Sequence, residues 1–322
     1  MPKSRKRPRP RGRRSKGGQG RRMRIAEFFE HTVLGAGRVS PHPVLYHYTT
    51  SSGALNILTS QEFWSTAHDC TNDEAELASA NSIVVEVAQT CRRKNDTGTA
   101  AKVLDVFLAN YPNSMITQMR TVYLSCFSAA RDDASQWREY GDNGCGVCLG
   151  IRVLEEPAPK KTEIVSVTLE VDYSETSLRA WLAVTFGKIC SALARVQPSS
   201  SNCEDGLSAL YRIAAYASIR AKRDKWKNEQ EVRLVTLARH TTGVEHRERT
   251  SATGKVIRYL PVSVRANGKL IALDEIIIGA NQNSEETREQ LKTILAAKGY
   301  EVGSVEYPRI TVSSVPVVSP KS

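Results

Sequence analysis

The chain has 322 residues, of which 40% are hydrophobic and 25% charged, and its net charge is +11. This is the composition of an ordinary globular protein that is long enough to bury a sizeable core. No run of about 18 apolar residues occurs, so the sequence excludes a membrane-spanning helix.

The positive charge is concentrated at the N-terminus. Residues 1–24 hold twelve lysines and arginines and no acid, and the remainder of the chain has 33 basic against 34 acidic residues. Because this segment also contains Pro and Gly and almost nothing apolar, it cannot bury enough surface to offset the cost of ordering. We therefore expect a disordered basic arm, Lys3 to Arg24, that binds nucleic acid weakly and with a strong salt dependence. No apolar stretch follows the charges, which excludes a signal peptide.

Beyond this arm the sequence predicts one folded domain. We expect residues 1–40 to form the arm and a linker, residues 41–316 a single α+β domain, and residues 317–322 a short tail. Seven cysteines, an odd number scattered along the chain, favour free thiols in a reducing, cytoplasmic compartment. Cys145 and Cys148 have the spacing of a metal knuckle, but no second pair follows, so we expect no metal site.

In chain order, apolar residues recur with the two-residue period of strands or the 3.6-residue period of helices. The expected strands are residues 44–49, 63–64, 121–128, 146–153, 164–173, 229–238, 256–264, 274–279, 300–307 and 310–315. The expected helices are residues 52–58, 72–94, 101–111, 132–140, 174–196, 206–227 and 283–295. Residues 239–254 are polar and charged, which predicts a loop.

These elements predict a mixed α+β domain with a curved or split mixed β-sheet and inserted helices. Strands and helices do not alternate strictly, and no Gly-rich phosphate-binding loop follows a strand, which disfavours Rossmann and P-loop folds.

The segment from Trp226 to Arg233 is the most informative part of the chain. Glu229 and Glu231 occupy alternate positions at the start of an expected strand, so their side chains should share one face. Two neighbouring carboxylates repel each other, which a fold tolerates at a solvated edge or beside a cationic partner. They are candidates for acid/base chemistry or for binding a sugar hydroxyl. The alternative is an exposed strand edge that pairs with Lys225, Lys227 or Arg233.

A second candidate segment is the first expected strand, where His47 lies between Tyr46 and Tyr48. His47 and Thr49 should share one face of the strand, while the two tyrosines share the other. A histidine at a strand end can donate to a ligand's ribose or phosphate, or it can bond a backbone carbonyl.

The middle of the chain adds hydroxyl and aromatic side chains. Ser128 ends an expected strand, and Trp137 and Tyr140 lie three residues apart on the following helix. This aromatic pair is suited either to packing in the core or to stacking on a planar ring. Arg233 is a possible anion partner, with ion pairing as the alternative.

Taken in order, these segments resemble domain-of-unknown-function family 2971, a mostly bacterial group, over about residues 44–315. The motifs that carry the resemblance are Tyr46-His47-Tyr48-Thr49, Phe63-Trp64, Asn72-Asp73-Glu74-Ala75-Glu76, Ser125–Ser128, Trp137-x-x-Tyr140, Gly144-x-Gly146-Val147-Cys148-Leu149, Trp226-x-x-Glu229-x-Glu231-x-Arg233 and Ile276-Ile277-Ile278-Gly279. The family name implies no reaction.

A second and more remote resemblance is to ADP-ribosyltransferases, including those that modify nucleic acids. It implies an ADP-ribosyltransferase-like architecture with NAD as substrate. Glu231 would then bind the nicotinamide ribose, Glu229 would orient or deprotonate the acceptor, and His47 would bond the NAD ribose. Tyr140 or Trp137 would stack on nicotinamide. The remaining residues of the implied NAD pocket are Tyr48, Ser128 and Arg233.

The resulting hypothesis is an NAD-consuming ADP-ribosyltransferase-like enzyme, of the toxin or defence-effector kind, that acts on nucleic acid or protein. Two alternatives stay open. One is a non-catalytic nucleic-acid-associated protein in which Glu229 and Glu231 are structural. The other is a hydrolase that uses the same carboxylates with water as acceptor.

Overall fold

The computed structural model describes residues 42–70, 74–111, 122–152, 164–238, 246–251, 254–262, 265–266, 270–304 and 307–317. The basic arm, Lys3 to Arg24, and the expected helix start at Asn72 and Asp73 lie outside these residues. Within the described part of the chain, no helix combines the length and apolar character needed to cross a bilayer.

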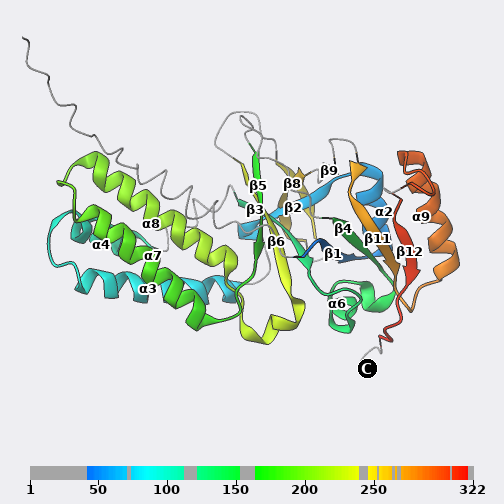
Figure 1. The fold of residues 1–322 in the computed structure, drawn as a ribbon, viewed down its shortest axis with the longest axis horizontal. Coiled ribbons are helices and arrows are strands. Elements are labelled where there is room, and N and C mark those ends of the chain that lie inside the picture. Colours follow the sequence, from blue (N-terminus) through cyan, green and yellow to red (C-terminus); the bar gives the residue numbers. More distant parts are fainter. Residues whose placement is uncertain are drawn as a thin grey trace, which may run out of the picture.

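The described strands form one open ten-stranded sheet and a separate two-stranded ribbon (Figure 1). The strands of the large sheet are β1 (Val44–Thr49), β2 (Phe63–Ala67), β3 (Val122–Ser128), β4 (Val147–Arg152), β5 (Ile164–Glu170), β6 (Glu231–Ala238), β7 (Arg247–Thr250), β8 (Val256–Val262), β11 (Leu273–Ile278) and β12 (Arg309–Val312). The ribbon pairs β9 (Arg265–Ala266) with β10 (Leu270–Ile271). The sheet is mixed because β11 and β12 run parallel while its other paired strands run antiparallel.

The sheet divides at β3. One edge of β3 pairs along its whole length with β6. On the other edge, β1 pairs only at Ser128, while β2 pairs only at Leu124 and Tyr123. The two arms that begin there are β1-β4-β11-β12 and β2-β8-β7. The sheet is therefore split opposite residues 125–127 of β3. The prediction of a mixed sheet, curved or split, is confirmed in that the sheet is mixed and open.

Helices cover both faces of this sheet. They are α2 (Ser51–Ser60), α3 (Glu74–Arg93), α4 (Gly98–Asn110), α6 (Ala134–Glu139), α7 (Glu175–Leu193), α8 (Ser200–Arg220) and α9 (Ser284–Lys298). The 3-10 helices are η2 (His68–Cys70), η3 (Asp142–Gly144) and η4 (Asp224–Glu229). Figure 1 shows α3, α4, α7 and α8 bundled at one side of the sheet and α2 and α9 at the opposite side.

Alternation along β3 and β6 assigns one core to each face. Leu124 and Val235 face the four-helix bundle and join its apolar core. Phe127 and Val232 point the other way, into the core covered by α2 and α9. Each fully buried side chain of this size contributes about 1.5–3 kcal/mol relative to exposure. The bundle helices enter as pairs, α3 and α4 between β2 and β3, and α7 and α8 between β5 and β6, which confirms the expected insertion of helices.

Several predicted boundaries are wrong. Helix α8 begins at Ser200, six residues before the predicted start, because the Ser199 hydroxyl accepts a hydrogen bond from the Asn202 amide and caps it. It ends at Arg220, because Ala221 adopts an extended conformation. The described residues of the predicted strand 300–307 are not extended in a strand, and residues 301–304 form a turn with Gly303 at φ 85°.

The predicted loop at residues 239–254 differs in detail, and the start of α9 has a local side-chain contact. The loop predicted at residues 239–254 contains β7, an edge strand whose four residues are all exposed. With no buried face, it has no apolar alternation to reveal it. At the start of α9, Asn283 makes no side-chain cap, and instead its amide donates to the Glu286 carboxylate at 3.1 Å.

Candidate functional site

The acidic pair lies on the bundle-facing side of the sheet, beside the split. In β6, Glu231 pairs with Ser128 and Arg233 pairs with Cys126 of β3. Directly paired residues share a face, so these four side chains project from the same side of the two strands. This position lies at the carboxyl end of β3, next to the point where β1 pairs with Ser128.

The two glutamates come from different elements, contrary to the prediction of a single strand. Glu229 is the last residue of η4, Gln230 adopts the left-handed conformation with φ 44°, and Glu231 begins β6. Both glutamates are 7% exposed. The exposed-edge alternative is therefore wrong for this pair, because the reversal at Gln230 turns both side chains inward.

Lys222 joins the two carboxylates. Its ammonium contacts Glu229 Oε2 and lies 2.6 Å from Glu231 Oε2. Arg233 completes the network, since its Nε donates to Glu231 Oε1 at 2.7 Å and another of its nitrogens donates to the Ile219 carbonyl at 2.6 Å. Two buried cations thus balance two buried anions. Of the three partners expected from the sequence, Arg233 does pair with Glu231. Lys225 instead lies over the Trp226 ring, 4.7 Å from its centroid, and Lys227 lies 3.7 Å from Asp224.

This network holds Glu231 and Lys222 in their charged forms. Burial alone would raise the pKa of Glu231, but the charges and hydrogen bonds of Arg233 and Lys222 outweigh it and lower this pKa to about 2. Burial would likewise lower the pKa of Lys222, yet the carboxylates of Glu231 and Glu229 raise it above its usual value. Glu231 is therefore an ionised carboxylate at neutral pH, which suits it to stabilising positive charge.

Two tyrosines border the network. The Tyr140 hydroxyl donates to Glu229 Oε1 at 3.1 Å, while the residue as a whole is 48% exposed. Tyr173 accepts a hydrogen bond from the Glu231 backbone amide at 2.8 Å. Burial, together with the nearby carboxylates, raises the pKa of Tyr140. Tyr140 is thus a protonated donor with a solvent-facing ring, as a stacking role requires.

Ser128 fixes the backbone of the acidic segment. The residue is 1% exposed, and its hydroxyl donates to the Glu229 carbonyl at 2.6 Å and accepts from the Ala130 amide at 3.0 Å. The Ala129 amide also donates to the Gln230 carbonyl at 2.9 Å. Ser128 therefore positions Glu229, and the loop after β3 is tied directly to the turn that carries the glutamates.

His47 lies at the split of the sheet, on the face opposite the one that carries the acidic pair. Its Nδ1 lies 3.1 Å from the Cys126 carbonyl, and its ring packs 5.3 Å from Phe63 and 5.5 Å from Phe127. Burial lowers the pKa of His47, partly opposed by the hydrogen bond to Cys126. A neutral ring donates from Nδ1 to this carbonyl. Strand β3 therefore separates His47 from the acidic pair.

Tyr48 and Trp137 belong to a different cluster. Trp137 is fully buried, packs edge-on against Tyr48 with ring centroids 5.0 Å apart, and donates its indole N–H to Asp132 at 2.8 Å. The Tyr48 hydroxyl donates to the Ala130 carbonyl and accepts from the Asp133 amide. These contacts support core packing for both residues. Only Tyr140 of the predicted aromatic pair offers an exposed ring beside the acids.

Cys126 is a site residue that the sequence did not identify. It is exposed and lies opposite Arg233, with its thiol directed at Glu231. Crowding by the surrounding protein, and then the charge of Glu231, raise the pKa of this thiol. Its S–H is a weak donor. Cys126 is therefore an exposed residue whose thiol lies next to the buried Glu231 carboxylate.

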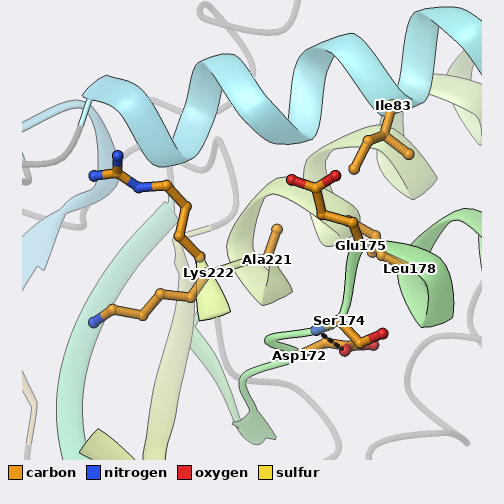
Figure 2. A pocket seen from close by; sticks show the side chains of 8 residues that line it. Ile83, Asp172, Ser174, Glu175, Leu178, Ala221 and Lys222 are labelled. Atoms are coloured by element: carbon orange, nitrogen blue, oxygen red, sulfur yellow. Dashed lines mark hydrogen bonds between the residues drawn. The ribbon is translucent and has the colours of Figure 1, made fainter. Parts of the chain in front are cut away.

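Lys222 was also missed, because a lysine that follows a helix has no distinctive spacing. Figure 2 shows its stem beside a small cavity of about 10 Å³ near Asp172 and Ser174, with its nitrogen directed away from them. An open groove of about 600 Å³ runs alongside, lined by Tyr173 and by charged side chains from two segments. Those charged side chains are Glu170, Asp172, Arg220, Asp224 and Lys227.

Comparison with known proteins concerns the segment that carries most of this site. Residues 136–234, from α6 into β6, match the family described as Protein of unknown function (DUF2971). No curated protein and no solved structure matches the chain. Neither search connects it with ADP-ribosyltransferases. The match includes Tyr140, Lys222, Glu229, Glu231 and Arg233, and over this segment the chain is similar to the family DUF2971 of unknown function.

Proposed function

We propose that the chain is an NAD-consuming enzyme that resembles ADP-ribosyltransferases in its chemistry. The observation that carries the proposal is the ionised, buried Glu231, which lies on the same face as the exposed Cys126 beside the split of the sheet. Cleavage of the nicotinamide–ribose bond leaves oxocarbenium-like positive charge on the ribose, and a fixed carboxylate stabilises such charge.

The hydrogen-bonding capacity of the site fits this role. A carboxylate has about four lone-pair positions. Arg233 and Lys222 fill most of those on Glu231, and the weak Cys126 thiol donor approaches the remainder. A ribose hydroxyl is the stronger donor and would replace the thiol. Within the described part of the chain, Glu229 accepts from the Tyr140 hydroxyl and the Lys222 ammonium, so its carboxylate would have a further lone pair for a proton from the attacking nucleophile.

In the proposed reaction, the C1′–N bond breaks and its electron pair leaves with nicotinamide. A nucleophile on the acceptor forms the new bond to C1′ and gives its proton to Glu229. The ring of Tyr140, a residue that is 48% exposed, would stack on the nicotinamide. With water as nucleophile the same steps would release free ADP-ribose.

The experiment is to incubate the full chain with NAD and cell lysate and to measure free nicotinamide. Glu231→Gln should lower the rate by about 10²–10³-fold, the cost of removing one electrostatic stabiliser. Because this change leaves Arg233 buried without its anion, circular dichroism must show that the variant is folded. Tyr140→Phe offers a milder test, since it removes one hydroxyl and no charge. Glu301→Gln, in an exposed turn, is the matched control and should keep the wild-type rate.

One observation favours the non-catalytic alternative. Both carboxylates already have cationic partners, as expected of a network whose role is purely structural. Absence of nicotinamide release by the wild type, with lysate present as a source of acceptors, would exclude the transferase and support this alternative.

A further inference from the structure

The sheet arm formed by β2, β8 and β7 displays an aromatic and basic surface. In its ladders, Trp64 pairs with Pro261, and Tyr259 pairs with Arg247 on its other side. Arg249 is two residues along from Arg247. Because paired residues share a face and alternate residues return to it, Trp64, Tyr259, Arg247 and Arg249 project from one face of the arm.

The aromatic part of this surface is open to solvent. Trp64 is 43% exposed, although its neighbours Phe63 and Ser65 point to the opposite face and are buried. The Trp64 ring stacks on Tyr259 with centroids 4.6 Å apart and 28° between the planes. Tyr259 thus supports the tryptophan ring from within the arm and leaves much of it accessible.

The charge on this face is positive. All four residues of β7 are exposed, and the guanidinium of Arg249 lies 5.8 Å from the Trp64 ring centroid. The only acid in the three strands is Glu248, which pairs with Arg258 and therefore projects from the other face. The face that carries Trp64 consequently combines a stacking ring with two arginines and no strand carboxylate.

This surface lies on the same side of the sheet as the acidic pair. Thr66 of β2, two residues beyond Trp64, pairs with Leu124 of β3. Cys126 is on the same face of β3 as Leu124, and it lies opposite Arg233. A chain bound along the arm would therefore run toward the exposed Cys126 and Glu231.

We infer that this face binds single-stranded nucleic acid, with a base stacked on Trp64 and the flanking phosphates bound by Arg247 and Arg249. Stacking on an aromatic ring between cationic side chains is how proteins hold single strands without reading their sequence. A duplex keeps its bases stacked inside, and the Asp and Glu side chains of an acidic peptide carry no ring that could stack on Trp64. If the bound strand is also the acceptor of the reaction, that part of the inference rests on the proposed function. The binding itself requires no NAD.

The test compares two fluorescent strands of equal length, oligodeoxythymidylate and its abasic analogue, by anisotropy with the full chain and without NAD. Both strands carry the same phosphates, so the basic arm contributes equally to both. The wild type should bind the base-bearing strand roughly tenfold more tightly. Trp64→Leu should reduce this ratio to about one, while Trp64→Phe retains part of it. Melting curves check that each variant is folded.

The arginines are tested separately. The double change Arg247→Gln and Arg249→Gln should weaken binding of both strands, whereas Lys188→Gln, an exposed cation on α7, should not. A ratio of one in the wild type, or a ratio unchanged in folded Trp64→Leu, would overturn the inference. So would equal competition by polyglutamate, which would identify a general polyanion surface. Nicotinamide release without selective binding would reject only this inference, and selective binding without release would reject only the proposed reaction.

Discussion

At the scale of single residues, Lys222 is the centre of the candidate site. Its ammonium serves two buried carboxylates, and its side chain is 9% exposed. Removing one partner from a buried ionic network leaves uncompensated charge, which costs more than the network contributes while intact. The lysine should therefore matter for stability whether or not the site is catalytic.

We predict that Lys222→Met destabilises the fold by about 3–5 kcal/mol, measured from urea unfolding, because Glu229 and Glu231 would be left close together without their shared cation. The control is Lys227→Met, since Lys227 is 63% exposed and its pair with Asp224 is solvated. That variant should change the free energy of unfolding by less than about 1 kcal/mol. Equal effects from the two substitutions would contradict the assignment.

The depressed pKa of Glu231 predicts a specific acid sensitivity. Its pKa is about 2 in the folded chain against an ordinary value of 4.5, so its contribution is fully present above pH 4.5 and is lost as the pH falls toward 2. The size is on the order of 3 kcal/mol, at 1.36 kcal/mol per pKa unit. Urea unfolding at pH 5 and pH 3 should show a smaller loss for Glu231→Gln than for the wild type. Equal losses of unfolding free energy in the wild type and in Glu231→Gln would contradict this prediction.

At the scale of elements, the turn between α6 and β4 depends on close backbone approach. A Cβ atom on Gly146 would lie 2.2 Å from the Thr49 carbonyl oxygen and 2.9 Å from that of Gly141. Both atoms belong to the backbone, so neither can move aside as a flexible side chain would.

Gly146→Ala should therefore destabilise the fold by about 1–3 kcal/mol, the usual cost of overpacking, measured by urea unfolding. Gly187→Ala is the control, because a Cβ there would meet nothing within 4 Å, and alanine favours the interior of α7. If Gly146→Ala left the free energy of unfolding unchanged or raised it, the backbone of this turn could shift to accept a Cβ atom, contrary to the prediction.

Among the elements, some could be predicted from the sequence and others could not. The apolar periods of β1, β3 and β6 were readable because each strand has at least one buried face. Strand β7 was missed because it has none. At the acidic pair, the residue types pointed to a charged cluster, but the left-handed Gln230 that turns both side chains inward left no mark in the pattern. Lys222, supplied by the segment after α8, could be found only from tertiary structure.

At the scale of the whole molecule, charge separates the chain into two parts. Residues 1–24 account for the positive balance, and the remainder carries 33 basic and 34 acidic residues. Binding through many cations falls steeply with added salt, because each phosphate contact releases counterions.

Deletion of residues 1–24 should accordingly weaken binding to single strands and flatten the dependence of log K on log salt. The preference for base-bearing over abasic strands should persist, since it belongs to Trp64 on β2. Anisotropy titrations at several salt concentrations provide both quantities. Loss of the preference on deletion would assign it to the arm and not to the sheet.

The division of the sheet at β3 also bears on how the chain is made. The hydrogen bond from Ser128 to Glu229 joins positions 101 residues apart, and β6 pairs with β3 along its whole length. During synthesis, the ribosome completes β3 well before it begins β6. The apolar edge of β3 stays unpaired until both α7 and α8 have emerged, and an unpaired edge of this kind is a template for aggregation. We therefore expect the nascent chain to be most prone to aggregation in the interval between Ser128 and Glu231.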